Sequence, residues 1–262
     1  MPQLTRNRPR TSIRVEQRIE FLPNPAVPKF VLASTSSLYG ADAPVPYRED
    51  ARANRPLSPY AASKKAAEGL AFAYHHLYPA LDVSVLRYFT VYGPAGRPDM
   101  SVFRFIEQLR AGLPLTVYGD GSQSRDFTYV DDVARGTVAA LRPCGFEIIN
   151  LGGDSPVLLS SLIDRLGKLL GRVPAIEYHP AHPADVHATW ADVAKARHLL
   201  KWSPSVTLDE GLRRTVDWHL AAYTSPLSPA SGPSPHTNPL SPARGPSPHT
   251  NQRGGFVLPT ND

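Results

Sequence analysis

Two residues that can act together as an acid and a base, Tyr60 and Lys64, stand four positions apart in the segment Ser58-Pro59-Tyr60-Ala61-Ala62-Ser63-Lys64. A proline suits the first turn of a helix, and residues four apart project from the same helical face. A nearby ammonium group favours the phenolate form of a tyrosine, so the pair could remove a proton from a hydroxyl group. Such a pair also arises on helices by chance, so its neighbours decide what it means.

Two segments that read as strands flank this helix. Residues 29–40 form a short apolar run that opens into a turn rich in hydroxyl groups and ends at Gly40, and residues 83–94 form a second run that ends in Gly-Pro. A strand, a helix and a strand in this order predict a parallel crossover, with the active site at the carboxyl ends of the strands. We expect Thr35, Tyr60 and Thr90 near that edge.

With these segments the chain resembles the extended short-chain dehydrogenase/reductase family, and within it the NAD-dependent nucleotide-sugar epimerases. The matching stretches occur in the family's order within about residues 29–221, and they are 33–40, 58–64, 86–100, 117–121, 125–133 and 150–152. Residues 89–100 are most similar to the UDP-glucuronate 4-epimerase branch. The resemblance implies an α/β fold with the C-terminal half of a Rossmann-like parallel sheet and a small α/β substrate-binding subdomain.

The resemblance also implies a reaction, a cofactor and site residues. Tyr60 would take the proton of the sugar 4-hydroxyl while hydride leaves C4 for NAD, and the 4-keto sugar would turn and take the hydride back on its other face. Lys64 would assist Tyr60, and Thr35 would hydrogen-bond the reacting oxygen. The residues expected to contact NAD are Ala33, Ser34, Tyr60, Lys64, Tyr88, Phe89 and Val91.

The substrate is expected to be a UDP-sugar, most closely UDP-glucuronate. Dehydratases of the family carry acidic residues directly after the catalytic threonine, and this chain has Ser36 and Ser37 there, which favours a reaction confined to C4. We hypothesise that Ser36, Ser37, Thr90 and Arg97 hold the sugar carboxylate, because a bidentate arginine suits such a group. Thr35 contacts the sugar as well, Arg125 resembles a diphosphate ligand, and Asp185 is placed to reach the uridine ribose. No metal site is expected.

The family's Gly-x-x-Gly-x-x-Gly turn, which holds the cofactor pyrophosphate, is not found in the sequence, and residues 1–28 contain no glycine. The chain is therefore expected to keep the catalytic and substrate side of the family without its adenine side. Three interpretations follow: a truncated epimerase that is inactive by itself, an epimerase completed by another chain, or a non-catalytic protein that binds sugar nucleotides or other partners. Another NAD-dependent sugar epimerase of the family is the alternative for the substrate.

Composition divides the chain into three parts: a basic irregular segment (1–28), the epimerase region (29–224) and a Pro/Ser-rich tail (225–262) in which a unit of thirteen residues occurs twice. The net charge is +5, but residues 1–28 carry five Arg against two Glu and the tail carries two Arg against one Asp, so the middle is almost neutral. Nucleic acid is therefore not an expected partner, and neither is a membrane. One cysteine, Cys144, excludes an internal disulfide framework, and the composition fits a soluble cytoplasmic domain. The intact family member is expected to form a homodimer.

Overall fold

The computed structural model describes residues 28–41 and 43–224. The expected basic N-terminal segment, except Pro28, and the expected repeat tail lie outside the described residues. All the described residues belong to one unit of the chain, Met1–Ser225.

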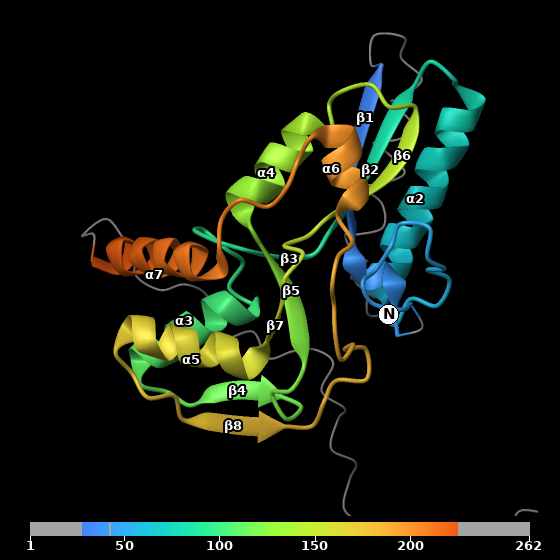
Figure 1. Ribbon diagram of the computed structural model, residues 1–262. Coiled ribbons are helices and arrows are strands. Elements are labelled where there is room, and N and C mark those ends of the chain that lie inside the picture. Colours follow the sequence, from blue (N-terminus) through green and yellow to red (C-terminus); the bar gives the residue numbers. More distant parts are fainter. Residues whose placement is uncertain (1–27, 42, 225–262) are drawn as a thin grey trace, which may run out of the picture. The chain divides into compact units, whose positions relative to one another are not determined.

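The first sheet consists of three parallel strands in the order β1-β2-β6 (Figure 1). The strands are β1 (Lys29–Thr35), β2 (Asp82–Tyr88) and β6 (Phe146–Leu151). Thr35 lies opposite Tyr88, which in turn lies opposite Leu151, so the carboxyl ends of all three strands meet at one edge. The predicted parallel crossover is confirmed.

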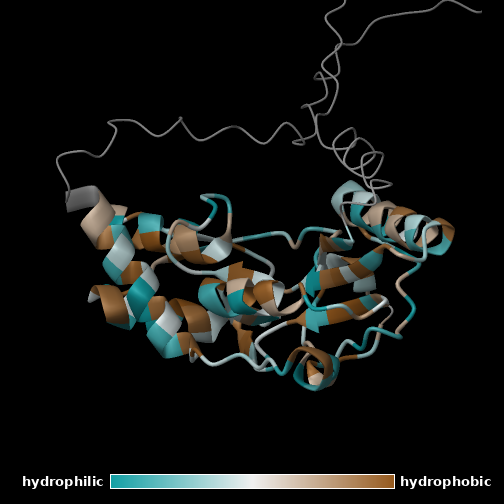
Figure 2. Ribbon diagram, turned by 90° about the horizontal axis from the view of Figure 1, so that it is seen from above, coloured by the Kyte–Doolittle hydropathy of each residue, from teal (hydrophilic) through white to brown (hydrophobic). Residues whose placement is uncertain are grey.

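Helices cover both faces of this sheet, which explains why the strands are apolar on both sides. On one face Val83 and Val85 pack with Ala67 and Ala71 of helix α2. On the other face Leu86 packs in a cluster with residues of two further helices and the segments that follow them. The helices are α2 (Pro59–Leu77), α4 (Val130–Ala139) and α6 (Ala194–Leu200). Figure 2 shows hydrophilic and hydrophobic residues alternating along the helices, as the covering of a core requires.

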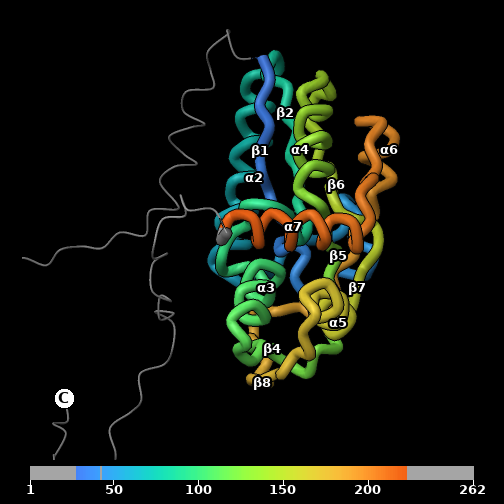
Figure 3. Tube along the Cα trace, turned by 90° about the vertical axis from the view of Figure 1, so that its left-hand side faces the viewer, coloured from blue at the N-terminus to red at the C-terminus, as the bar shows by residue number. Residues whose placement is uncertain are grey.

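A smaller sheet, β4 paired in parallel with β8, forms the core of the expected substrate-binding subdomain. Helices α3 and α5 pack on each other beside it (Figure 3). Phe105 and Ile106 of α3, Leu162 and Leu166 of α5 and Leu212 of α7 share one buried cluster. The bounds are α3 (Ser101–Ala111), β4 (Leu115–Tyr118), α5 (Leu159–Leu170), β8 (Ile176–His179) and α7 (Leu208–Thr224).

Three short strands make a third sheet, in which β5 runs parallel to β3 and antiparallel to β7. They are β3 (Thr90–Tyr92), β5 (Ser124–Tyr129) and β7 (Pro156–Leu158), and a 3-10 helix, η1 (Ser36–Tyr39), follows β1. Because β3 follows β2 after one residue and α4 follows β5 directly, this sheet joins the two regions. Among the described residues, no helix is long and apolar enough to cross a bilayer.

The starts of α3 and α4 differ from what the sequence suggests, whereas the end of α3 agrees. The sequence favours Asp99 or Ser101 as the cap of α3, but the residue before the helix is Met100 and it makes no side-chain cap bond. Helix α4 begins in the same way after Tyr129, and Asp132 bonds to a distant loop instead. The polar side chains have stronger partners elsewhere. Gly112 ends α3 in the left-handed conformation, as the sequence predicts.

Candidate active site

Thr35 lies where β1 ends and η1 begins, at the carboxyl edge of the first sheet. Its side-chain oxygen accepts a hydrogen bond of 3.2 Å from the backbone N–H of Ser37 and lies 3.2 Å from the Ser37 hydroxyl. This bond caps the short helix and holds the largely buried Thr35 in one orientation. Ser36 is half-buried and Ser37 is exposed at the same turn.

Helix α2 brings Tyr60 and Lys64 to this edge. Ser58 caps the helix by accepting a hydrogen bond of 3.1 Å from the N–H of Ala61, so the helix begins at Pro59 and Tyr60 lies in its first turn. The Lys64 ammonium group donates a hydrogen bond of 2.8 Å to the carbonyl oxygen of Ala33, two residues before Thr35. The phenol of Tyr60 is half exposed, as a group that meets a ligand must be.

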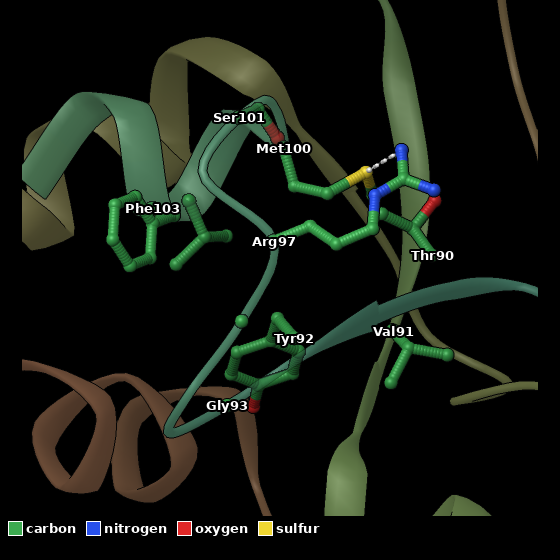
Figure 4. A pocket seen from close by; sticks show the side chains of 10 residues that line it. Thr90, Val91, Tyr92, Gly93, Arg97, Met100, Ser101 and Phe103 are labelled. Carbon is green, nitrogen blue, oxygen red and sulfur yellow. Dashed lines mark hydrogen bonds between the residues drawn. The ribbon is translucent and has the colours of Figure 1, made fainter. Parts of the chain in front are cut away.

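Thr90 and Arg97 line one pocket, with Val91 and residues from the loop that leads into α3 (Figure 4). Arg97 holds the carboxylate of Asp99 through two hydrogen bonds, of 2.9 Å from Nε and 2.7 Å from Nη2. These bonds raise the pKa of Arg97, and the charge of a Tyr60 phenolate adds a smaller effect in the same direction. Arg97 therefore lies within electrostatic range of the Tyr60–Lys64 pair.

Arg125 and Asp185, assigned by resemblance to the nucleotide, form an ion pair and line a second pocket. Arg125 also donates to the carbonyl oxygens of Ser124 and His187, at 2.7 and 3.2 Å, so its position is fixed. Arg104 contributes another cation to the same pocket, and its guanidinium lies 5.8 Å from the centre of the Tyr118 ring. An arginine pair beside an aromatic ring can bind a phosphate group and a planar base. The sequence analysis missed Arg104, which no local motif distinguishes.

Three of the residues expected to contact NAD bear side chains that point into the protein. The Tyr88 hydroxyl lies 2.9 Å from the Thr137 hydroxyl of α4, and Phe89 is buried beside the rings of Tyr39 and Tyr47. Ser34 is buried as well. At the sheet edge these residues therefore present main-chain groups, whereas Lys64 and Tyr60 present side chains.

A buried ion pair that the sequence analysis missed connects helix α2 to the first sheet. Glu68 of α2 and Arg87 of β2 are 3% and 2% exposed, and their two hydrogen bonds measure 3.0 and 2.8 Å. The hydroxyl of Ser34 donates a third bond of 2.6 Å to Glu68. Glu68 lies one turn beyond Lys64 on the helix, so these bonds fix Lys64 against β1. The available signals were an arginine within an apolar strand and a glutamate four residues after Lys64.

A second buried carboxylate, Asp126, organises the chain next to Arg125. It accepts backbone hydrogen bonds of 2.7, 3.2 and 2.8 Å from Gly153, Asp154 and Ala191. Burial raises the pKa of Asp126 to about 6, although these bonds act to lower it. Asp126 thus joins β5 to the loop after β6 and to the segment before α6, and thereby holds the strand that carries Arg125.

The parallel sheet and the Tyr–Lys pair at its carboxyl edge define the chain as an α/β protein of the nucleotide-cofactor type. Residues 16–152 match the NAD dependent epimerase/dehydratase family, and the chain belongs to this family. The resemblance seen in the sequence is thereby confirmed.

Individual relatives agree with this assignment. The chain is 55% identical over 201 residues to a UDP-glucuronate 4-epimerase of Thermodesulfobacterium geofontis, covering 76% of this chain and 62% of the relative. A structure of UDP-glucuronic acid 4-epimerase from Bacillus cereus, in complex with UDP-glucuronic acid and NAD, has a TM-score of 0.76 and 40% identity, with 80% of this chain and 67% of that chain covered. UDP-glucose 4-epimerase of Thermotoga maritima with UDP-glucose gives a TM-score of 0.73 at 31% identity, covering 81% and 69%. The chain spans between about half and about two thirds of the length of the curated relatives it matches.

Proposed function

We propose that the chain carries the catalytic and substrate-binding part of an NAD-dependent UDP-sugar 4-epimerase, with UDP-glucuronate as its substrate. The observation that carries this proposal is the bond from Lys64 to the carbonyl of Ala33, because it brings the Tyr60–Lys64 pair to the strand end that bears Thr35. The relatives from Thermodesulfobacterium geofontis and Bacillus cereus are named for the same reaction.

The residues at this edge fit the nicotinamide end of NAD. Lys64 has ammonium hydrogens beyond the one used by Ala33, and the main chain of Ser34 and Val91 lies at the same edge. When bound, NAD would supply the acceptor and donor of a hydride at sugar C4. The pyrophosphate end would need a glycine-rich turn between a strand and a helix, and the described residues offer none.

The protein groups supply the proton chemistry. Tyr60 as phenolate takes the proton of the 4-hydroxyl while hydride leaves C4, which gives a 4-keto sugar; the same proton returns to O4 when hydride returns to the other face. Thr35 donates a hydrogen bond to the reacting oxygen, and Lys64 stabilises the phenolate. Arg125 and Asp185 hold the nucleotide, while Thr90 and Arg97 receive the C6 carboxylate together with Ser36 and Ser37.

The test measures the conversion of UDP-glucuronate to its C4 epimer by two proteins. One is the chain alone, and the other is a fusion in which the chain follows the segment of the Bacillus cereus relative that has no counterpart in it. We expect the fusion to be active and Tyr60→Phe to lower its turnover by about 100-fold or more, with the affinity for UDP-sugar retained. Turnover close to that of the parent fusion would remove Tyr60 from the role of base.

We also propose that the protein is a cytoplasmic homodimer that pairs through α2. Phe72 and Leu77 are exposed apolar residues of this helix, and Ala62, Ala66 and Gly69 are exposed small residues that would allow close helix packing. The cytoplasm is proposed because a chain with one cysteine has no internal disulfide that an oxidising compartment would have to form. Sedimentation velocity of the chain and of its Ala66→Arg variant tests the pairing, since a monomeric wild type would contradict it.

A further inference from the structure

Asp99 occupies one of the two edges of Arg97 that can hold a carboxylate. A guanidinium offers two edges for bidentate bonding, one through Nε with one Nη and one through both Nη atoms. Asp99 takes the first edge with bonds of 2.9 and 2.7 Å, and Nη2 also lies 3.6 Å from the sulfur of Met100. All the hydrogen bonds of Arg97 within the described residues use these two nitrogens.

The pocket beside this pair is narrow. Thr90, Arg97 and Met100 line it together (Figure 4), and the space within it is about 20 Å³. That volume accommodates roughly one water molecule. A sugar carboxylate that approaches Thr90 therefore meets Arg97, whose partner in the absence of ligand is Asp99.

We propose that Asp99 is a specificity-determining residue that competes with the sugar carboxylate for Arg97. This competition weakens the bond between Arg97 and an acidic sugar, so that the bond forms and breaks readily. This inference rests on the proposed function and adds to it a residue that the substrate does not touch. Both side chains of the pair are 69% exposed, so the pair itself is weak and its partners exchange easily. Asp99 thus lowers the affinity for UDP-glucuronate and leaves that for UDP-glucose, whose C6 is neutral, unchanged.

The competition has a use in the reaction. The 4-keto sugar has to turn within the site before it is reduced on its other face, and a carboxylate fixed by an arginine with no other partner would resist that turn. When Arg97 releases the sugar carboxylate, it can return to the ion pair with Asp99 that exists in the absence of ligand. Asp99 acts through Arg97 and is in this sense a positioning residue.

Calorimetry on the full chain tests the proposal, because the residues assigned to the nucleotide and to the carboxylate all lie within it. We expect Asp99→Asn to tighten the binding of UDP-glucuronate by about twofold to fivefold, the range that an exposed ion pair supports. The Kd of UDP-glucose should stay the same. In the Arg97→Ala background, Asp99→Asn should no longer tighten UDP-glucuronate binding.

Asp164→Asn serves as the control, since it changes the net charge by the same amount at an exposed position on α5. The proposal is overturned if Asp99→Asn weakens UDP-glucuronate, if it acts equally on both sugars, or if its effect persists without Arg97 or matches that of the control. Binding of both sugars by the wild type with no change in Asp99→Asn refutes the competition alone. Failure of the wild type to bind either sugar refutes both the competition and the proposed function.

Discussion

Each of the central side chains of the site is held by one nearby contact. Thr35 is fixed by the N–H of Ser37, Lys64 by the carbonyl of Ala33, and Arg97 by Asp99. Two of these contacts lie within two residues along the chain. Thr35 was predicted from its place at a strand end and from the family resemblance, and Arg97 from the resemblance and from the suitability of an arginine for a carboxylate. The contact of Lys64 crosses from helix to strand, and only the expectation of a parallel crossover could place it.

Gly93 shapes the loop between Thr90 and Arg97. Its φ is +147°, and a Cβ there would lie 2.5 Å from Cγ1 of Val130. We expect Gly93→Ala to lower the free energy of unfolding by about 1–3 kcal/mol, because it adds a clash to a conformation unfavourable for side chains, and to weaken the binding of UDP-glucuronate. Urea unfolding and calorimetry measure both.

Gly112→Ala is the matched control, since its φ is +67° and a Cβ there meets nothing within 4 Å. It should cost only the conformational part, about 1 kcal/mol, and leave sugar binding unchanged. Equal losses for the two variants would show that the Val130 contact has no effect on the loop.

At the level of elements, the Glu68–Arg87 pair determines how α2 sits on the sheet. Removing one partner leaves the other charge buried and unpaired, so Glu68→Ala should destabilise the protein by about 3–5 kcal/mol. The double variant Glu68→Leu/Arg87→Met removes both charges and should recover most of that loss. Urea unfolding of both variants checks this, and a double variant as unstable as the single one would indicate that hydrogen bonding to Ser34, and not charge burial, dominates.

Asp132 connects α4 to the segment before α7. Its carboxylate accepts backbone hydrogen bonds of 2.9 and 3.0 Å from Ser205 and Val206, and the Arg135 side chain pairs with it. Burial alone would raise the pKa of Asp132, but these bonds outweigh it and the pKa is lowered. A carboxyl with a lowered pKa in the folded state stabilises the fold above its ordinary pKa, and that contribution is lost as the pH falls through the lowered value.

We therefore expect Asp132→Asn to lower the free energy of unfolding at pH 7 by about 1–3 kcal/mol. The difference between variant and wild type should shrink below about pH 4, where the wild-type carboxyl begins to take up its proton. Urea unfolding between pH 3 and 7 measures this, and a difference independent of pH would contradict the assigned role of the charge.

Elements were predictable from the sequence where a local signal sets them. Pro59 and Gly112 mark a helix start and a helix end, and the apolar run at 83–86 predicts a buried strand, all of which the structure contains. Asp99 or Ser101 was expected to cap α3 and Asp131 or Asp132 to cap α4, but neither helix has a side-chain cap bond. Asp99 pairs with Arg97, two residues before it, and Asp132 bonds to the distant Ser205. Long-range pairings such as Glu68 with Arg87 cannot be read from spacing, because they depend on which strand lies under the helix.

At the scale of the whole molecule, the affinity of the 262-residue chain for NAD depends on which parts of the cofactor it can contact. The described residues include the edge proposed to meet the nicotinamide, but no glycine-rich turn at a helix N-terminus, the feature that binds a pyrophosphate. We expect the chain alone to bind NAD with a Kd weaker than about 100 μM, and calorimetry measures it. Sub-micromolar affinity would show that another part of the chain binds the pyrophosphate.

Stability at this scale depends on strand β1. Among the described residues it pairs only with β2, so its other edge presents backbone N–H and C=O groups without strand partners there. Leu32 on this strand is buried and Val31 is half-buried, as in the interior of a parallel sheet. We expect the chain alone to self-associate or to unfold with low cooperativity, and to gain a sharper, higher transition when mixed with the unmatched part of the Bacillus cereus relative. Sedimentation and scanning calorimetry test this, and a monomer with a sharp transition above about 60 °C, high for a mesophilic domain, would mean that the edge of β1 is already covered.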